Sequence, residues 1–100
     1  MSVMVMLRAK GDPAALESWA ASHKKTLMDI AAEGKAAGAI HHTFAAGNGE
    51  VCVIDEWPDA ESFQKFFAGQ ADIPKVMAAG GIQGQPEITV MRKMDMPDEF

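Results

Sequence analysis

Residues 39–67 read AIHHTFAAGNGEVCVIDEWPDAESFQKFF and contain the signals of two strands followed by a helix. The Asn48-Gly49 dipeptide separates two stretches rich in β-branched and aromatic residues, and Asn-Gly favours a tight type I′ hairpin turn. Pro58 cannot donate to a sheet ladder and therefore ends the second strand. Asp59 is a good helix N-cap, and three phenylalanines follow at helical spacing. The stretch predicts a β-hairpin that leads directly into an amphipathic helix.

A strand and a helix are also predicted on the amino-terminal side of this stretch. Residues 2–9 (SVMVMLRA) are apolar at both alternating sets of positions, which is typical of a strand covered on both faces. Asp12 then supplies an N-cap, and Pro13 suits the first helical position. Apolar residues follow at spacings of three and four, so we predict one helix that ends near Gly34, or by Gly38 at the latest.

The carboxyl-terminal third predicts the remaining elements. Pro74 should break or kink the second helix and leave a short turn or helix after it. Residues 87–94 (EITVMRKM) predict the last strand, and the tail of residues 95–100 is expected to be extended, with Phe100 available to dock on a neighbour. The order β-α-β-β-α-β predicts an α+β fold of ferredoxin-like type, a four-stranded antiparallel sheet with two helices on one face. One domain should span residues 1–100.

The second face of this sheet has no cover within the chain. Met4 and Met6 of the first strand and several apolar residues of the third strand belong to it. Leaving such side chains in water forfeits about 1.5–3 kcal/mol each, so a second copy of the chain is the simplest cover. The sequence therefore predicts a homodimer.

Composition excludes several classes of partner and compartment. The chain has 100 residues, of which 48% are hydrophobic, and a formal net charge of -5. The acidic balance argues against nucleic-acid binding, and the scattered cations form no polybasic membrane patch. Cys52 is the single cysteine, which excludes an intramolecular disulfide and a CxxC motif. Neither a signal peptide nor a membrane-spanning run is visible, so we expect a cytoplasmic protein.

The segment DEWPDAESFQKFF (residues 55–67) is an acidic and aromatic strand end that leads into a capped helix. It resembles the dimeric α/β-barrel superfamily, and most closely the antibiotic-biosynthesis-monooxygenase-like (ABM-like) branch, over nearly the whole chain. The resemblance implies two sheets that face each other in a barrel and a ligand pocket in each subunit. Members of the group include cofactor-free oxygenases of polycyclic aromatic substrates, isomerases and haem-degrading enzymes. The last use a helix histidine and a strand asparagine, but here the second helix contains no histidine and the first strand no asparagine, so haem chemistry is disfavoured.

Two histidine–carboxylate pairs follow from the predicted hairpin. A two-residue turn places His42 opposite Asp55 and His41 opposite Glu56. Because neighbouring strand residues point to opposite faces, one pair faces the helices and the other faces the barrel side, and a metal site built from both histidines is improbable. A carboxylate beside an imidazole orients it as a general base requires.

We take His42 as the candidate general base or hydrogen-bond donor and Asp55 as the residue that orients it. Further pocket residues are predicted from the strands and the first helix: Trp57, Trp19, His23, Phe44 and His41. The alternative for each histidine is a solvated or hydrogen-bonded core residue, and for each tryptophan a core residue. Which of the two adjacent histidines faces a pocket stays open.

Three functions are compatible with these residues. The leading hypothesis is a homodimeric, cofactor-independent enzyme of monooxygenase-like or isomerase-like type that acts on a small apolar, aromatic or polyketide-like molecule without a metal. The second is a binding or stress-related protein with a ligand pocket and no turnover. The third is a structural homodimer whose lumen is filled by methionine and aliphatic side chains. No HExxH, GxSxG, P-loop or dinucleotide motif is present.

Overall fold

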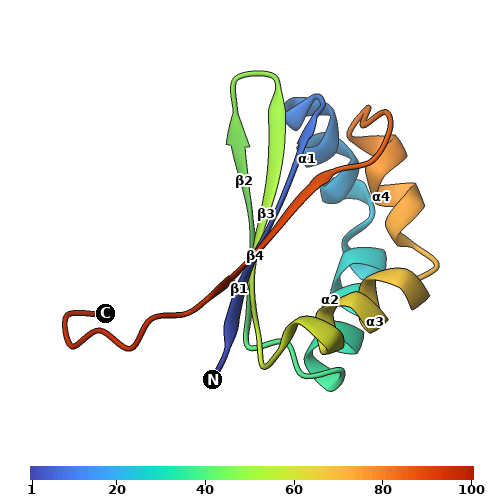
Figure 1. Ribbon diagram of the computed structural model, residues 1–100. Helices are drawn as coiled ribbons and strands as arrows, with labels where there is room; N and C mark the ends of the chain where they lie inside the picture. Colours follow the sequence, from blue (N-terminus) through green and yellow to red (C-terminus); the bar gives the residue numbers. More distant parts are fainter.

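A computed structural model covers residues 1–100 and shows a sheet with helices packed on one face (Figure 1). The elements in chain order are β1 (Val3–Lys10), α1 (Pro13–Ser22), α2 (Lys24–Ala36), β2 (His41–Gly47), β3 (Glu50–Trp57), α3 (Ala60–Gly69), α4 (Ile73–Ala79) and β4 (Glu87–Arg92). The strands are antiparallel and lie in the order β2-β3-β1-β4. The predicted ferredoxin-like α+β fold is confirmed.

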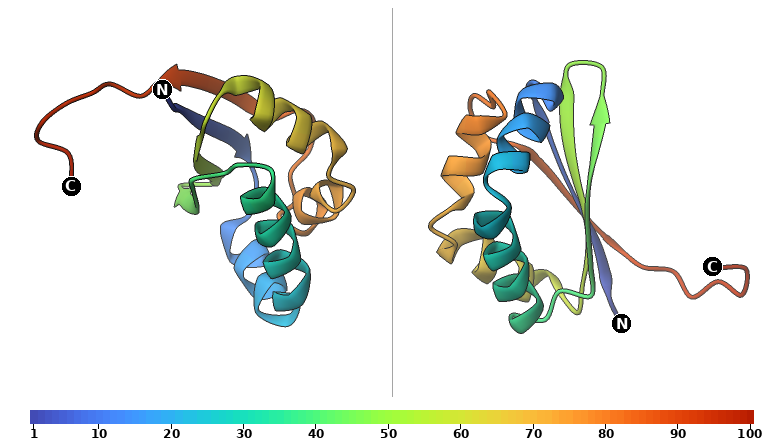
Figure 2. Two further views of the ribbon diagram at one scale, coloured as in Figure 1. Left: turned by 90° about the horizontal axis from the view of Figure 1, so that it is seen from below. Right: turned by 180° about the vertical axis from the view of Figure 1, so that it is seen from behind.

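Two further views agree that the helices lie on one side of the sheet (Figure 2). The four helices all cover the same face. The opposite face, which we call the open face, carries no helix, and the chain leaves the domain on that side after β4. No helix is long and apolar enough to cross a membrane.

The β2–β3 hairpin has the predicted register but a different turn. Gly47 pairs with Glu50, so the loop consists of Asn48 and Gly49 alone. Gly49 has φ 71°, whereas no residue other than glycine has a positive φ. The type I′ prediction is therefore wrong, because that turn needs a positive φ at both central residues.

The predicted single first helix is in fact two helices, α1 and α2, that meet at His23. Asp12 caps α1 as expected, with its carboxylate accepting from the N–H of Ala15 at 3.1 Å. At the other end the His23 ring lies 2.9 Å through Nδ1 from the carbonyl oxygen of Trp19, which is the acceptor that the His23 N–H would use in a continuous helix. The His23 N–H bonds to Ala20 instead, and its backbone (φ −128°, ψ 38°) leaves the helical region. The histidine side chain thus competes with the helix and ends it.

The second helical segment follows the prediction. The Asp59 carboxylate accepts from the N–H of Ser62 at 2.7 Å and caps α3. The helix ends at Gly69, and Pro74 lies in the first turn of the separate short helix α4.

The core is small and lies between β1, β3 and α3. Its buried cluster consists of Val5, Leu7, Trp57 and Phe63. Only 9 of the 100 residues are buried, so most apolar side chains outside this cluster still border solvent or a cavity.

Three loops are tied together by backbone hydrogen bonds around Gly11. Its N–H bonds to the carbonyl of Gly49 in the hairpin turn at 3.1 Å, and the N–H of Asp12 bonds to the carbonyl of Gly80 after α4 at 2.8 Å. A Cβ atom built on Gly11 would lie 2.8 Å from that Gly80 oxygen. The contact is with backbone, so it cannot be relieved by turning a side chain.

Gly11→Ala is therefore expected to lower the free energy of unfolding by about 1–3 kcal/mol, the usual cost of an overpacked site. Urea denaturation followed by circular dichroism would measure it. Gly69→Ala is the matched control, because a Cβ at that helical position meets nothing within 4 Å. Equal stability of the Gly11 variant and the control would contradict the predicted clash.

The open face presents apolar side chains in its centre. Met4, Met6, Cys52 and Ile54 are half-buried there, and Met91 is 49% exposed. Burial raises the pKa of the Cys52 thiol above its ordinary value. The thiol is thus kept protonated at neutral pH and behaves as a small apolar residue of this face.

Candidate functional site

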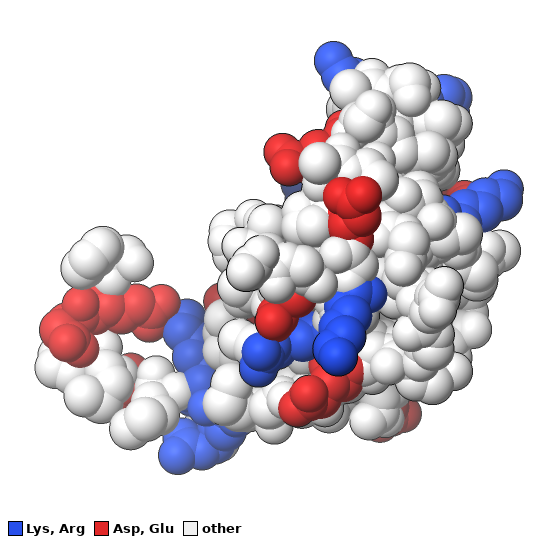
Figure 3. All heavy atoms as spheres, turned by 90° about the horizontal axis from the view of Figure 1, so that it is seen from above, with Lys and Arg blue, Asp and Glu red and all other residues white.

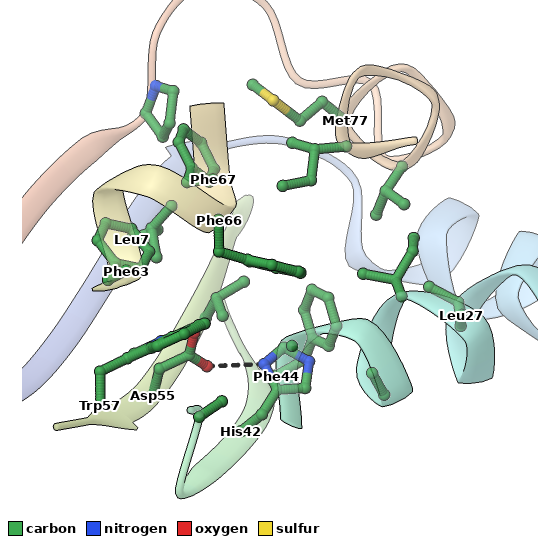
Figure 4. A pocket seen from close by; sticks show the side chains of 18 of the residues that line it. Leu7, Leu27, His42, Phe44, Asp55, Trp57, Phe63, Phe66, Phe67 and Met77 are labelled. Carbon is green, nitrogen blue, oxygen red and sulfur yellow. Dashed lines mark hydrogen bonds and ion pairs between the residues drawn. The ribbon is translucent and has the colours of Figure 1, made fainter. Parts of the chain in front are cut away.

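A cavity of about 620 Å³ lies between the sheet and the helices. Strands β1, β2 and β3 form its floor, and α2, α3 and α4 form its walls and roof (Figure 4). Of its 26 lining residues 20 are hydrophobic. A volume of this size suits a drug-sized organic molecule, and an apolar wall with few polar groups is typical of a small-molecule site.

Aromatic rings line one end of this cavity. Trp57 packs against Phe66 with ring centroids 5.5 Å apart and against Phe63 at 6.0 Å, and Phe63 stacks on Phe67 at 5.6 Å. Phe44 approaches the His42 ring edge-on at 5.2 Å. Leu27 and Met77 line the far end (Figure 4). The rings offer flat apolar surfaces to a flat ligand.

The polar group in the floor is a linked set of three side chains, His42, Asp55 and Trp57. Asp55 is 7% exposed, and its Oδ1 lies 2.6 Å from Nδ1 of His42. Its other oxygen, Oδ2, accepts from the indole N–H of Trp57 at 3.1 Å. Both carboxylate oxygens are therefore engaged, as a buried carboxylate requires.

The pairing assigns the tautomer of His42. An ionised carboxylate only accepts hydrogen bonds, so the proton between the two groups belongs to Nδ1 of His42. In the neutral ring Nε2 then holds a free lone pair. The His42 side chain is 46% exposed, so a ligand in the cavity can reach it. This is the geometry of a general base held in place by a carboxylate.

Strand alternation explains why these residues meet. His42, Phe44, Asp55 and Trp57 all occupy positions that face the helices, with His42 directly opposite Asp55. The predicted register and the shared face of these four residues are confirmed, whereas the sequence left open which of the two faces meets the helices. The catalytic roles stay a prediction.

The second histidine–carboxylate pair belongs to the open face. His41 is opposite Glu56, whose Oε2 accepts from the Ser2 hydroxyl at 2.6 Å and lies 3.4 Å from the Lys93 ammonium. These contacts, the Ser2 hydrogen bond first, hold the pKa of Glu56 below its ordinary value. His41 borders the cavity at the start of β2, although its strand position turns it toward the other face.

Trp19 and His23 do not line the cavity, so their prediction as pocket residues is wrong. The two rings stack on each other at the α1–α2 junction, with centroids 4.2 Å apart and planes within 10°. His23 is exposed there. The prediction assumed an unbroken helix, whereas α1 ends and α2 begins at His23.

Several cavity residues were not singled out as a site from the sequence. Phe66 and Phe67 were expected only as an apolar helix stripe, and Leu27 and Val76 as ordinary apolar positions. Their spacing is that of any buried helix face, so nothing in the pattern distinguishes a cavity wall from a packed core. No group of three or more histidine, cysteine or acidic side chains is placed to hold a metal ion.

Comparisons with known proteins identify the fold. No family model and no curated protein match the sequence. The chain is similar in structure to Rv0793 from Mycobacterium tuberculosis, with a TM-score of 0.62 and 16% identity over 98% of this chain and 100% of that chain. A putative antibiotic biosynthesis monooxygenase from Caulobacter crescentus gives 0.61 and 22% identity over 94% and 91%. SnoaB, a cofactor-independent oxygenase from Streptomyces nogalater, gives 0.58 and 18% over 98% of each chain. The chain therefore has the fold of the antibiotic biosynthesis monooxygenase structures.

Proposed function

We propose that this protein is a cofactor-independent enzyme that removes a proton from a small, apolar, aromatic molecule and lets the resulting anion react with dioxygen. The observation that supports it most directly is the His42–Asp55 pair in the floor of an apolar cavity. The likeness in fold to a cofactor-independent oxygenase supports the same chemistry.

The cavity suits the proposed substrate class. The aromatic walls of the cavity favour a flat molecule of two or more fused rings. The cavity has few polar groups, so such a molecule has one preferred orientation, with the acidic C–H or O–H of the ligand toward Nε2 of His42. Once His42 has taken the proton, the Asp55 carboxylate stabilises the imidazolium.

The electrons for dioxygen reduction come from the substrate in this proposal. Anthrone illustrates the balance: its methylene carbon loses two hydrogens and gains one oxygen atom, which gives anthraquinone, and the second oxygen atom leaves as water. Deprotonation is the step that makes the ring system electron-rich. A base in an apolar site is therefore what the protein has to supply.

Anthrone and 1-naphthol are suitable probes for turnover. We expect oxygen consumption and quinone formation with at least one of them, and a fall of about 10²–10⁴-fold in His42→Ala, the usual contribution of a general base. His23→Gln is the control, since this histidine lies outside the cavity. A His42 variant as active as the control on a turned-over probe would refute the proposal.

The isomerase and binding alternatives can be read from the same assay. Conversion of a probe without oxygen uptake would indicate isomerisation by the same base. A binding protein without turnover needs no imidazole or carboxylate group in its cavity wall, and this wall contains both.

We also propose that the protein is a homodimer joined through the open face. Met4, Met6, Ile54 and Met91 form an apolar centre there that nothing in the chain covers. Burying these apolar side chains in a dimer interface would add hydrophobic stabilisation that the small core of one chain does not supply. Sedimentation velocity should give the mass of two chains, and a persistent single chain at high concentration would exclude this pairing.

A further inference from the structure

Lys35 is the only lysine or arginine that lines the cavity. It lies in the last turn of α2. The other lining residues of this helix precede it at helical spacing and are Leu27, Met28, Ile30, Ala31 and Gly34. A cation at this end of a helix offsets the helix dipole, but that role needs no place in a cavity wall. The base chemistry of His42 leaves this positive charge unused.

The Lys35 ammonium has no carboxylate partner within the chain. It takes part in none of the ion pairs of the structure. The positions three and four residues away on either side hold only alanine and glycine, so no acid of the same helix can reach it. Glu33 accepts a hydrogen bond from the Gln70 side chain instead. Asp55 is the only carboxylate in the cavity wall, and other side chains engage both of its oxygens.

An aromatic surface extends from the candidate base toward this lysine. The Trp57 ring, beside Asp55, packs against the Phe66 ring with centroids 5.5 Å apart (Figure 4). The Phe66 ring in turn lies against α2 at Gly34, where a Cβ atom would be 3.5 Å from it. Gly34 immediately precedes Lys35. A flat ring system that lies on these two aromatic side chains therefore points toward the end of α2.

The cavity is open to solvent on the side of α2 and β2. Lys35 is exposed, Ile40 is 57% exposed, and the His42 side chain is 46% exposed, although all three line the cavity. The Ile40 N–H bonds to the carbonyl of Glu56 in β3 at 2.8 Å, which holds the link between α2 and β2 against the sheet. A ligand can thus enter with its apolar end first and keep a charged group at this opening.

The charge of the whole molecule does not favour anions. The formal net charge is -5, and acidic and basic side chains lie interspersed on the face shown in Figure 3. Long-range attraction therefore works against an anionic ligand. Recognition of such a ligand has to come from a close contact inside the cavity.

We propose that Lys35 binds a carboxylate of the substrate, which makes the substrate class a flat aromatic acid that is apolar except for this one group. The carboxylate lies at the opening against the Lys35 ammonium, the rings lie on Trp57 and Phe66, and the reacting C–H or O–H faces His42. This inference deepens the function proposed above and rests on it, because it takes the same cavity as the substrate site.

Two probes of matched shape test the proposal without turnover. 2-Naphthoate and 2-naphthamide share one ring system and differ in charge. Shifts of the His42 ring signals in long-range ¹H–¹⁵N spectra report binding in the cavity, with His23 as the reference outside it. We expect the acid to bind about three- to fivefold more tightly than the amide, the modest contribution of a partly exposed ion pair.

Substitutions of Lys35 show whether this preference comes from its charge. Lys35→Gln should bring the ratio of the two affinities to about one, and Lys35→Glu should reverse the preference, since like charges repel. Lys24→Gln is the matched control. It removes the same charge from the same helix at an exposed position outside the cavity, and it should keep the ratio.

Equal affinity for the two probes would overturn the proposal, as would the absence of binding of either. A preference for the acid that survives Lys35→Gln, or that falls as far in Lys24→Gln, would also overturn it. If anthrone is turned over with the help of His42 but the affinity ratio is one, the aromatic-acid class alone fails. If the ratio depends on Lys35 but no probe is turned over, the carboxylate site stands and the oxygenase chemistry fails.

Discussion

Asp55→Asn is expected to reduce turnover by about 10²–10⁴-fold while the protein stays folded. The side chain keeps its size, and the Trp57 N–H still needs an acceptor in its buried position. The amide oxygen of the new side chain should therefore point to Trp57. Its NH₂ group is then left facing Nδ1 of His42.

This orientation reverses the tautomer of the histidine. An amide NH₂ donates, so Nδ1 of His42 must accept and the ring proton moves to Nε2. The nitrogen that faces the cavity then has no lone pair for a substrate proton. The variant would thus lose the base without losing a hydrogen bond.

The tautomer can be measured without knowing the substrate. Long-range ¹H–¹⁵N spectra distinguish a protonated Nδ1 from a protonated Nε2, with His23 as an internal reference. We expect His42 to change from the first form to the second in Asp55→Asn, and activity on any turned-over probe to fall with it. Unchanged spectra and unchanged turnover would show that Asp55 does not orient the ring.

Trp57→Ala is expected to cost about 3–5 kcal/mol of unfolding free energy, the range for removing a buried large aromatic side chain. Trp57 is 1% exposed, contacts Phe63 and Phe66, and donates to Asp55. The change removes the largest side chain of a small core and leaves Asp55 Oδ2 without its partner. Since small domains have about 5–15 kcal/mol in total, the expected loss is a large fraction of the whole free energy of unfolding.

Chemical denaturation followed by far-ultraviolet circular dichroism measures this effect independently of tryptophan fluorescence. Trp19→Ala is the control, because Trp19 is only half-buried and its ring stacks on the exposed His23. Trp57→Phe isolates the hydrogen bond, since it keeps most of the ring volume and loses the N–H donor. A Trp57→Ala protein as stable as the Trp19 variant would mean that the core lies elsewhere.

The hairpin shows what could be predicted from the sequence. Asn48-Gly49 and the two flanking strands determine the register, and the register places His42 opposite Asp55 and on the side of Trp57. These relations depend on counting residues along strands, where side chains alternate between the two faces as long as no bulge interrupts the ladder. The same count does not decide which of the two faces the helices cover.

His23 shows what could not be predicted from the sequence. The spacing of His23 from Trp19 fits a continuous helix face. However, the His23 ring contacts the Trp19 carbonyl oxygen, which the His23 N–H would need as its acceptor if the helix continued. A local competition of this kind depends on side-chain rotamers and not on periodicity. The cavity was also beyond prediction, because Phe66 and Val76 would have the same spacing in a filled core.

The strand order β2-β3-β1-β4 also has a consequence for synthesis on the ribosome. β1 is synthesised first, yet its partners are β3, near the middle of the chain, and β4, near its carboxyl end. At ordinary translation rates, about 4–16 s pass between the completion of β1 and that of β4. Throughout that time the valines and methionines of β1 can be buried only in part, which makes β1 a natural substrate for nascent-chain chaperones. The β2–β3 hairpin, by contrast, is local and can form as soon as it emerges from the ribosome.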